Sequence, residues 1–92
     1  MRAQYGGHFS AHLFRYPGKG GWTFVTVPEE LAPPVTAAWG RTPVHATVDG
    51  YSWNTSVWRE KSGRTLLAIP TKARGSKGHG DAVDVRLQLV SL

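Results

Sequence analysis

The sequence feature that most constrains the fold is an internal repeat with an offset of 42 residues. Residues 22–31 read Trp-Thr-Phe-Val-Thr-Val-Pro-Glu-Glu-Leu, and they align with residues 64–73, which read Arg-Thr-Leu-Leu-Ala-Ile-Pro-Thr-Lys-Ala. Pro28 falls on Pro70, and the residues before each proline also correspond: Val27 to Ile69, Val25 to Leu67, Phe24 to Leu66 and Thr23 to Thr65. Neither half carries enough strands to bury a core alone. The repeat therefore predicts two halves that wrap around one shared core.

A strand of alternating apolar and polar residues ends each half, after a glycine. In the second half, Val83, Val85 and Leu87 are separated by polar residues, which is the pattern of a half-buried strand. Residues 44–48 show the same alternation in the first half. The two strands are therefore expected to occupy equivalent places in the two halves.

Turn signals divide both halves in the same order. Residues 17–21 and 60–63 contain the glycines typical of turns, and Asp49-Gly50, a common hairpin signal, joins the halves. The strand that begins at Phe9 is expected to match the one that begins at Tyr51 at the same offset, although this similarity is weak. Each half is thus expected to run strand, turn, strand, helical turn, glycine turn, strand.

The acidic pair after Pro28 suits the first turn of a helix, where the helix dipole favours negative charge. Two further prolines limit that helix, so residues 35–39 are expected to be its only regular turn. We predict an all-β fold, a double-split (pseudo-)barrel of six or seven strands with one or two short helices. It is built from two tandem half-repeats, approximately residues 9–50 and 51–92, within one domain over residues 1–92.

The chain of 92 residues contains no cysteine. Disulfides, thiolate zinc sites and a cysteine nucleophile are therefore excluded. No apolar run approaches the roughly 18 residues of a membrane span, and the first ten residues lack the apolar core of a signal peptide. We expect a cytoplasmic protein with no membrane association and no cofactor. We also expect a monomer, because the repeat supplies its own partner.

The net charge of +5 is concentrated in the second half. Residues 1–50 hold four basic and three acidic residues, whereas residues 51–92 hold seven basic and three acidic residues. Such a basic half is typical of a protein with an anionic partner. The alternative is that the charge only keeps a small protein in solution.

A set of motifs spans residues 9–90: Phe9-x-Ala11-x-Leu13, Trp22-x-Phe-Val-x-Val-Pro28, Gly40-Arg-x-Pro-Val44 through Asp49-Gly50, Lys72-x-Arg74, and Gly80-Asp81-x-Val83-x-Val85. Together they resemble a bacterial domain of unknown function that is found alone or attached to YdeI-like proteins, which are described as bacteriocin-protection or OmpD-associated. The resemblance implies a double-split β-barrel, a fold shared with the AbrB/MazE-type swapped-hairpin regulators, which bind DNA as dimers. Residues 75–80 are glycine-rich where the family usually has a longer helix, and the resemblance implies no established activity.

The segment 72–80 is the first candidate site. It places Lys72, Arg74 and Lys77 among three glycines within nine residues. Glycines let backbone N–H groups approach a phosphate, and the cations supply the countercharge. The segment is therefore a candidate anion or nucleic-acid site, and the alternative is a solvated connector.

The turn at residues 60–63 is the second candidate site. Arg59, Lys61 and Arg64 flank it, and Trp58 lies beside them, so the turn offers cations and an aromatic ring that suit stacking on bases. The alternative is a charged hairpin tip that prevents sheet-edge pairing.

The other three tryptophans, Trp22, Trp39 and Trp53, are expected in the core because they occupy strand and helix positions inside the repeat. No catalytic or metal site is expected. His8 and His12 would lie roughly 13 Å apart along a strand, too far for a shared zinc ion.

Three functions remain open. The first is a non-enzymatic module that binds nucleic acid or another polyanion through the basic second half. The alternative is a protein-interaction or accessory domain, which predicts an exposed apolar or aromatic patch around Trp58. A small-molecule-binding barrel is the third.

Overall fold

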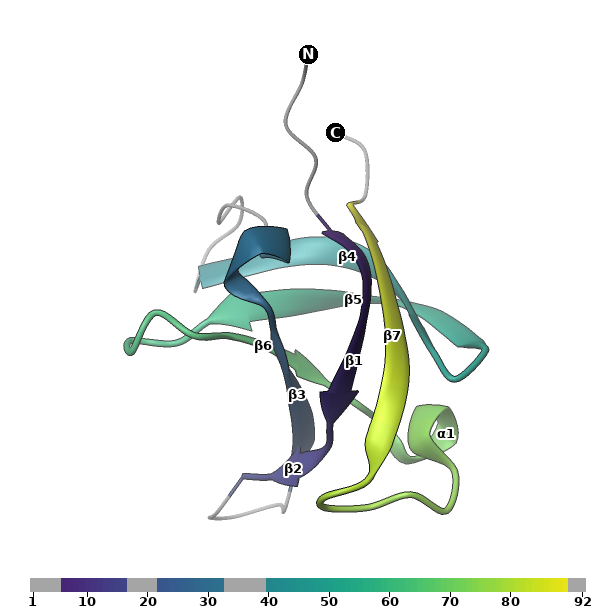
Figure 1. Cartoon of the computed structure of the whole chain (residues 1–92). Coiled ribbons are helices and arrows are strands. Elements are labelled where there is room, and N and C mark those ends of the chain that lie inside the picture. Colours follow the sequence, from purple (N-terminus) through teal and green to yellow (C-terminus); the bar gives the residue numbers. More distant parts are fainter. Residues whose placement is uncertain (1–5, 17–21, 33–39, 90–92) are drawn as a thin grey trace.

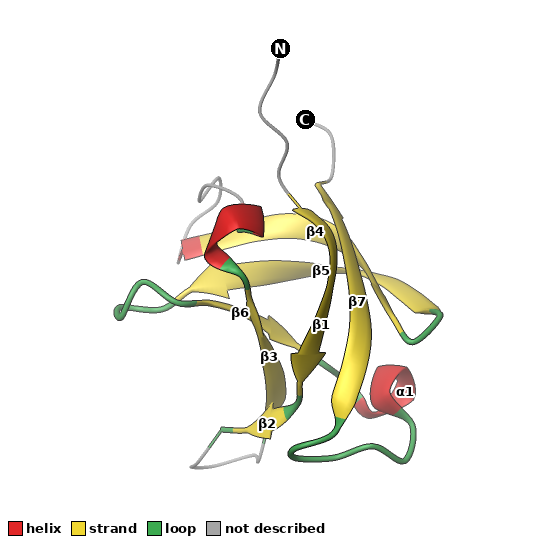
Figure 2. Ribbon diagram, in the orientation of Figure 1, coloured by secondary structure: helices red, strands yellow, loops and turns green. Residues whose placement is uncertain are grey.

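The computed structural model describes residues 6–16, 22–32 and 40–89. Within them the chain forms seven strands, a 3₁₀ turn and one short helix (Figure 1): β1 Gly6–His12, β2 Phe14–Arg15, β3 Thr23–Val27, η1 Glu29–Leu31, β4 Arg41–Val48, β5 Tyr51–Arg59, β6 Thr65–Ala68, α1 Thr71–Arg74 and β7 Ala82–Leu89. The strands form a single antiparallel sheet in the order β1-β7-β4-β5-β6-β3-β2, which curls into a nearly closed barrel (Figure 2). The predicted all-β barrel of six or seven strands with one or two short helices is confirmed.

The barrel closes because its two edge strands are consecutive pieces of one bent strand. β1 pairs with β7 at one edge of the sheet, and β2 pairs with β3 at the other. Leu13 is the bend between them and is 1% exposed. Its N–H donates to the Asp81 carbonyl at 2.8 Å, and its own carbonyl accepts from the Gly80 N–H at 2.7 Å. The two edge strands of the sheet, β1 and β2, are thereby joined through Leu13.

An approximate two-fold axis relates the two halves. Val25 pairs directly with Leu67, its equivalent 42 residues later, in the β3–β6 ladder. The strands β4 and β7 are both eight residues long and are offset by 41 residues, so Ala46 is equivalent to Leu87, and these two residues pair directly in the β4–β7 ladder. A residue that pairs with its own equivalent lies on the symmetry axis, so the axis passes through both pairs.

Strand pairing crosses between the halves. The last strand of the first half, β4, pairs with β5, and the last strand of the second half, β7, pairs with β1. Phe9 pairs with Val85, and Thr55 pairs with Val44, the equivalent of Val85. The strands therefore equate Phe9 with Thr55, and the weak sequence match of Phe9 to Tyr51 is wrong by four residues.

Alternation along the strands fills the barrel with valine, leucine, isoleucine and alanine side chains.

The two ends of the barrel are covered by equivalent helical turns. Leu31 of η1 packs against the core at one end, and Ala73 of α1, which follows Pro70, is buried at the other. The helical turn after each proline thus covers one end of the barrel.

The expected regular turn at residues 35–39 and the expected turn at residues 17–21 lie outside the described residues. In the part of the chain that is described, no helix is long and apolar enough to cross a membrane.

Candidate functional site

Five aromatic rings form a cluster on the outer surface of the barrel, over β2, β3 and the end of β5. Phe24 is at its centre, with ring centroids 6.0 Å from Phe14, 5.6 Å from Tyr16, 6.5 Å from Trp22 and 5.5 Å from Trp58. Phe24 points away from the core, yet it is 4% exposed because the other rings cover it. We call these five residues the aromatic face.

The cluster forms because β3 is apolar on both sides. Val25 and Val27 are core residues, and Phe24 occupies the opposite face of the strand between them. On the neighbouring strand β6, Leu66 also lies on the outer side and is buried, directly across from Trp58. A strand that is apolar at odd and even positions is covered on both faces, and here the outer cover is aromatic.

The aromatic face straddles the approximate two-fold axis. Phe24 is the equivalent of Leu66 at the 42-residue offset, and Phe14, which pairs with Phe24, corresponds to Trp58, which pairs with Leu66. At the same offset Trp22 is the equivalent of Arg64. The first half therefore supplies a tryptophan where the second half supplies a guanidinium.

Three rings of the aromatic face reach solvent: Trp22 is 62% exposed, Tyr16 39% and Trp58 37%. The prediction that Trp22 is a core residue is wrong, because its position continues the outward side of β3 rather than the inward one. Trp53 packs against the core as predicted. Trp39 lies outside the described residues.

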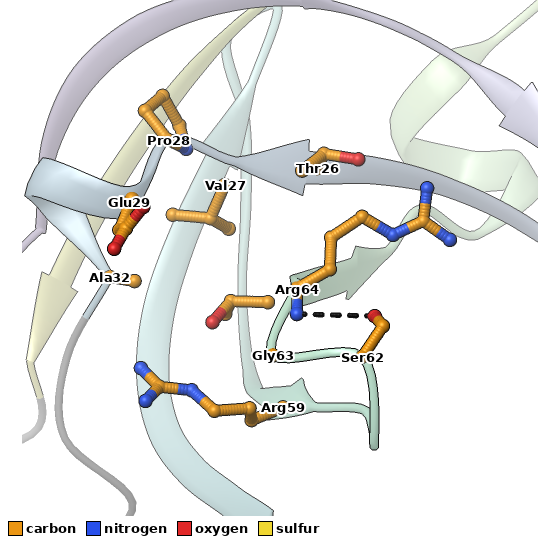
Figure 3. A pocket seen from close by; sticks show the side chains of 10 residues that line it. Thr26, Val27, Pro28, Glu29, Ala32, Arg59, Ser62, Gly63 and Arg64 are labelled. Atoms are coloured by element: carbon orange, nitrogen blue, oxygen red, sulfur yellow. Dashed lines mark hydrogen bonds between the residues drawn. The ribbon is translucent and has the colours of Figure 1, made fainter.

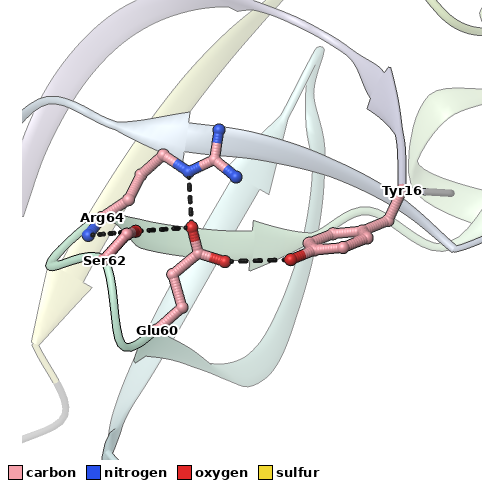
Figure 4. Close-up of polar contacts among 4 residues, drawn as sticks. All are labelled: Tyr16, Glu60, Ser62 and Arg64. Carbon is pink, nitrogen blue, oxygen red and sulfur yellow. Dashed lines mark hydrogen bonds and ion pairs between the residues drawn. The ribbon is translucent and has the colours of Figure 1, made fainter.

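Glu60 links the β5–β6 turn to the aromatic face (Figure 4). Tyr16 donates from its hydroxyl to Glu60 Oε1 at 3.2 Å, and Arg64 Nε donates to Oε2 at 2.8 Å. The Ser62 hydroxyl donates to the same Oε2 at 2.8 Å. These hydrogen bonds, first from Arg64 and then from Ser62, hold the pKa of the Glu60 carboxyl below its ordinary value.

Arg64 is held by the ring as well as by the carboxylate. Its guanidinium carbon lies 5.3 Å from the centroid of Phe14, which is a cation–π contact. The structure therefore places Trp58 and Arg64, two residues of the predicted hairpin site, in one cluster with four aromatic residues. The sequence patterns do not assign those four residues to a site. The signal available in the sequence was the pair Trp22 and Phe24, two aromatic residues on the outward side of β3 and its immediate N-terminal extension.

Positive charge accompanies the aromatic face. The segments that build it, residues 14–16, 22–26 and 58–66, together with Arg41 directly across from Trp58, carry five cations and one carboxylate, Glu60. The cations are Arg15, Arg41, Arg59, Lys61 and Arg64. Arg15 and Arg59 alternate with the ring-bearing residues along their strands and pair with the buried Thr23 and Thr65, so their side chains leave the other side of the sheet. Arg41, Lys61 and Arg64 are the cations that remain with the aromatic face.

The predicted loop site at residues 72–80 uses two of its three cations within the fold. Lys77 Nζ donates to Asp49 Oδ2 at 2.7 Å and to the Ala82 carbonyl at 2.8 Å. Arg74 donates from Nε to the Ile69 carbonyl at 3.3 Å, with longer contacts to two neighbouring residues. Lys72 is exposed on α1.

The loop and the hairpin are separate surfaces, because α1 and the β5–β6 turn lie on opposite sides of the barrel in Figure 1.

The hydrogen bond from Lys77, followed in size by the one from the Asp84 backbone N–H, holds the pKa of the Asp49 carboxyl below its ordinary value. Lys77 therefore ties the loop to the β4–β5 turn.

Polar residues elsewhere hold strands and turns together. His79 Nδ1 accepts the Arg15 backbone N–H at 3.0 Å, and Asp81 Oδ2 accepts the Gly78 N–H at 2.8 Å. Over residues 6–16, 22–32 and 40–89, no group of three or more histidine, cysteine, aspartate or glutamate side chains could hold a metal ion.

Comparison with known proteins places nearly the whole barrel in one described family. Residues 9–87 match the family model described as Domain of unknown function (DUF1905). The matched segment begins in β1 and ends in β7, so it includes every residue of the aromatic face. No curated protein matches the sequence.

Proposed function

The chain belongs to the DUF1905 family, and from that premise we propose that it is a non-enzymatic module that binds single-stranded nucleic acid through its aromatic face. The observation that carries the proposal is the coincidence of three solvent-exposed rings with the cations Arg41, Lys61 and Arg64. Exposed rings alone fit many partners, and positive charge alone fits any polyanion. Together they match a strand that offers flat bases and phosphates in alternation.

Stacking supplies the contact with bases. An aromatic ring that stacks on an unpaired base contributes about 1–3 kcal/mol, whichever base it is, because every base has a π face. Trp22, Tyr16 and Trp58 present such rings on the convex outer surface of the sheet. A duplex hides its base faces inside the stack, so these rings favour a single strand.

The cations supply the contact with phosphates. Arg64 lies over Phe14 at the edge of the cluster, and Arg41 is paired with Trp58 across the β4–β5 ladder. Lys61 is exposed at the tip of the β5–β6 turn. The loop cations Lys72, Arg74 and Lys77 are secondary in this proposal, because two of them bond within the fold.

A protein partner is the second candidate, and the same exposed rings support it. An aromatic patch around Trp58 is what an interaction domain requires. The resemblance to domains attached to YdeI-like proteins also favours it. The exchange of strands between the halves supports, in turn, the proposed relation to AbrB/MazE-type swapped-hairpin proteins. We propose a monomer in the cytoplasm in either case.

The test is fluorescence anisotropy with labelled single-stranded DNA, single-stranded RNA and duplex DNA, at about 50 and 200 mM salt. We expect tighter binding to single strands, and weaker binding at the higher salt. Trp22→Ala is expected to weaken binding about 5- to 100-fold, the loss of one stacked base. It should leave folding intact, because the ring is 62% exposed.

Lys72→Ala is the control, because it removes an exposed cation on α1, away from the aromatic face. It is expected to reduce affinity less than Trp22→Ala does. Absence of binding to any nucleic acid at 50 mM salt would overturn the proposal and leave the protein partner as the remaining candidate.

A further inference from the structure

A groove continues the aromatic face at one end of the barrel. It lies between the end of β3, the η1 turn and the β5–β6 turn, and it has a volume of about 530 Å³ (Figure 3). Pro28 and Ala32 give it partly exposed apolar surface beside the buried Val27, and Glu29 and Arg59 reach it from η1 and from β5. The volume is within the range of roughly 300–1,000 Å³ that small-ligand sites have in proteins.

The groove and the aromatic face share residues and a strand. Thr26, which lines the groove, comes two residues after Phe24 and is therefore the next side chain on the outer side of β3, about 7 Å further along. Ser62 and Arg64, which hold Glu60, also line the groove. A strand stacked on the rings and running along β3 would arrive at this groove.

On its η1 side, where Glu29 lies, the groove favours the edge of a base over a phosphate. The Glu29 carboxylate repels phosphate but accepts hydrogen bonds from an exocyclic amino group, as carboxylates accept from cytosine N4. Uracil and thymine present a carbonyl oxygen at that position, which a carboxylate cannot bond. The apolar surface of Pro28 and Ala32, which are both partly exposed, suits the flat face of a base.

We propose that the groove binds one nucleobase that carries an exocyclic amino group, and that Glu29 selects it. The inference rests on the proposed binding of single strands for the way the base arrives. Arg59 and Arg64, at the hairpin side of the groove, lie where the flanking phosphates of such a nucleotide would need countercharge.

The experiment compares oligomers of deoxycytidine and deoxyuridine, ten nucleotides long, by fluorescence anisotropy. The two bases differ at position 4 and in the adjoining ring proton, so their affinities report the amino group without the methyl group of thymine. The wild-type protein is expected to bind the cytidine oligomer at least about fivefold more tightly, the lower limit for a specific base contact. Glu29→Ala is expected to abolish that preference.

Glu30→Ala is the matched control, since Glu30 is the adjacent carboxylate, is exposed and is absent from the groove lining. It removes the same charge from the same turn and is expected to keep the preference for cytidine. A second arm measures thermal stabilisation by free deoxycytidine and deoxyuridine monophosphates. Stabilisation by the first alone, lost in Glu29→Ala, supports the groove independently of strand binding.

The failures are distinguishable. Equal, Trp22-dependent affinity for both oligomers would overturn the groove assignment and leave single-strand binding in place. A preference for cytidine that survives in Glu29→Ala would overturn the role of Glu29. Stabilisation by the free nucleotide without binding of either oligomer would overturn the proposed function and retain the groove as a nucleotide site.

Discussion

Glu60 is the one carboxylate on the segments that build the aromatic face, and both of its oxygens are used. Oε1 accepts from Tyr16, while Oε2 accepts from Arg64 and Ser62. The carboxylate therefore fixes an exposed ring and a cation that, in our proposal, contact the ligand. Its effect on binding has two opposing parts, repulsion of phosphate and orientation of the two groups.

We predict that orientation outweighs repulsion. Glu60→Ala is expected to weaken single-strand binding about fivefold, and to reduce the dependence of log affinity on log salt by about 0.7, the value for one lost phosphate contact. Glu60→Gln keeps one of the two hydrogen-bond acceptors and is expected to bind more tightly than Glu60→Ala. Anisotropy over a salt series measures both quantities.

Glu30→Ala is again the control, because it removes an exposed carboxylate on η1, outside the segments that build the aromatic face. Charge removal alone would strengthen binding equally in Glu30→Ala and Glu60→Ala. That equality would show that Glu60 only repels the ligand, contrary to the prediction.

At the scale of strands and turns, the close approach of Gly40 to β5 restricts which residue can stand immediately before β4. A Cβ atom at Gly40 would lie 2.9 Å from the backbone carbonyl of Arg59, and the backbone φ there is 71°. Gly40→Ala is therefore expected to lower the free energy of unfolding by about 2–4 kcal/mol, through both left-handed strain and displacement of β5. Urea denaturation provides the measurement.

Gly63→Ala separates the two causes. Gly63 also has positive φ, 94°, but a Cβ atom there meets nothing within 4 Å. Strain alone is expected to cost about 1–2 kcal/mol. Equal losses in the two variants would mean that the contact with Arg59 is not limiting.

The ion pair between the β4–β5 turn and the α1–β7 loop predicts a pH dependence. The pKa of Asp49 is below its ordinary value of 3.8 in the folded protein, chiefly because Lys77 donates to it. Its contribution to stability is therefore fully present above pH 3.8 and lost as the pH falls through the folded pKa. Asp49→Asn suits the positive φ of 48° at this position and isolates the charge.

We expect Asp49→Asn to lower the free energy of unfolding by up to about 1 kcal/mol at pH 6, since both partners are partly exposed. The difference from the wild type should shrink as the pH falls below 3.8. Urea denaturation between pH 6 and about pH 2.5 measures it. A difference that stays constant with pH would contradict the assignment of Lys77 to a stabilising role.

Sequence periodicity predicted elements better than it predicted surfaces. The 42-residue offset and the strand alternation predicted the core strands, because those patterns are local. Burial of Phe24 outside the barrel depends on rings from β2 and β5, which meet only through non-local pairing. The contact of Lys77 with Asp49 spans 28 residues, so a cation assigned to a ligand site by composition proved to bond within the fold.

At the scale of the whole molecule, the approximate symmetry holds at the centre of the core and is broken on the outer surface. Val25 and Leu67 are equivalent and both fully buried, as the shared core requires. Outside, Trp22 corresponds to Arg64, so one half contributes an exposed ring and the other a cation. In our proposal this asymmetry determines in which direction a single strand lies across an otherwise pseudo-symmetric surface.

The most direct test of the central claim is a titration of ¹⁵N-labelled protein with a single-stranded oligonucleotide, followed by the shifts of amide and tryptophan indole N–H signals. We predict large shifts at Tyr16, Trp22 and Trp58, and an unshifted indole signal from Trp53, which packs against the core. Amides of α1 should move little. Shifts confined to residues 72–80, or none at any position, would contradict the assignment of the aromatic face as the binding surface.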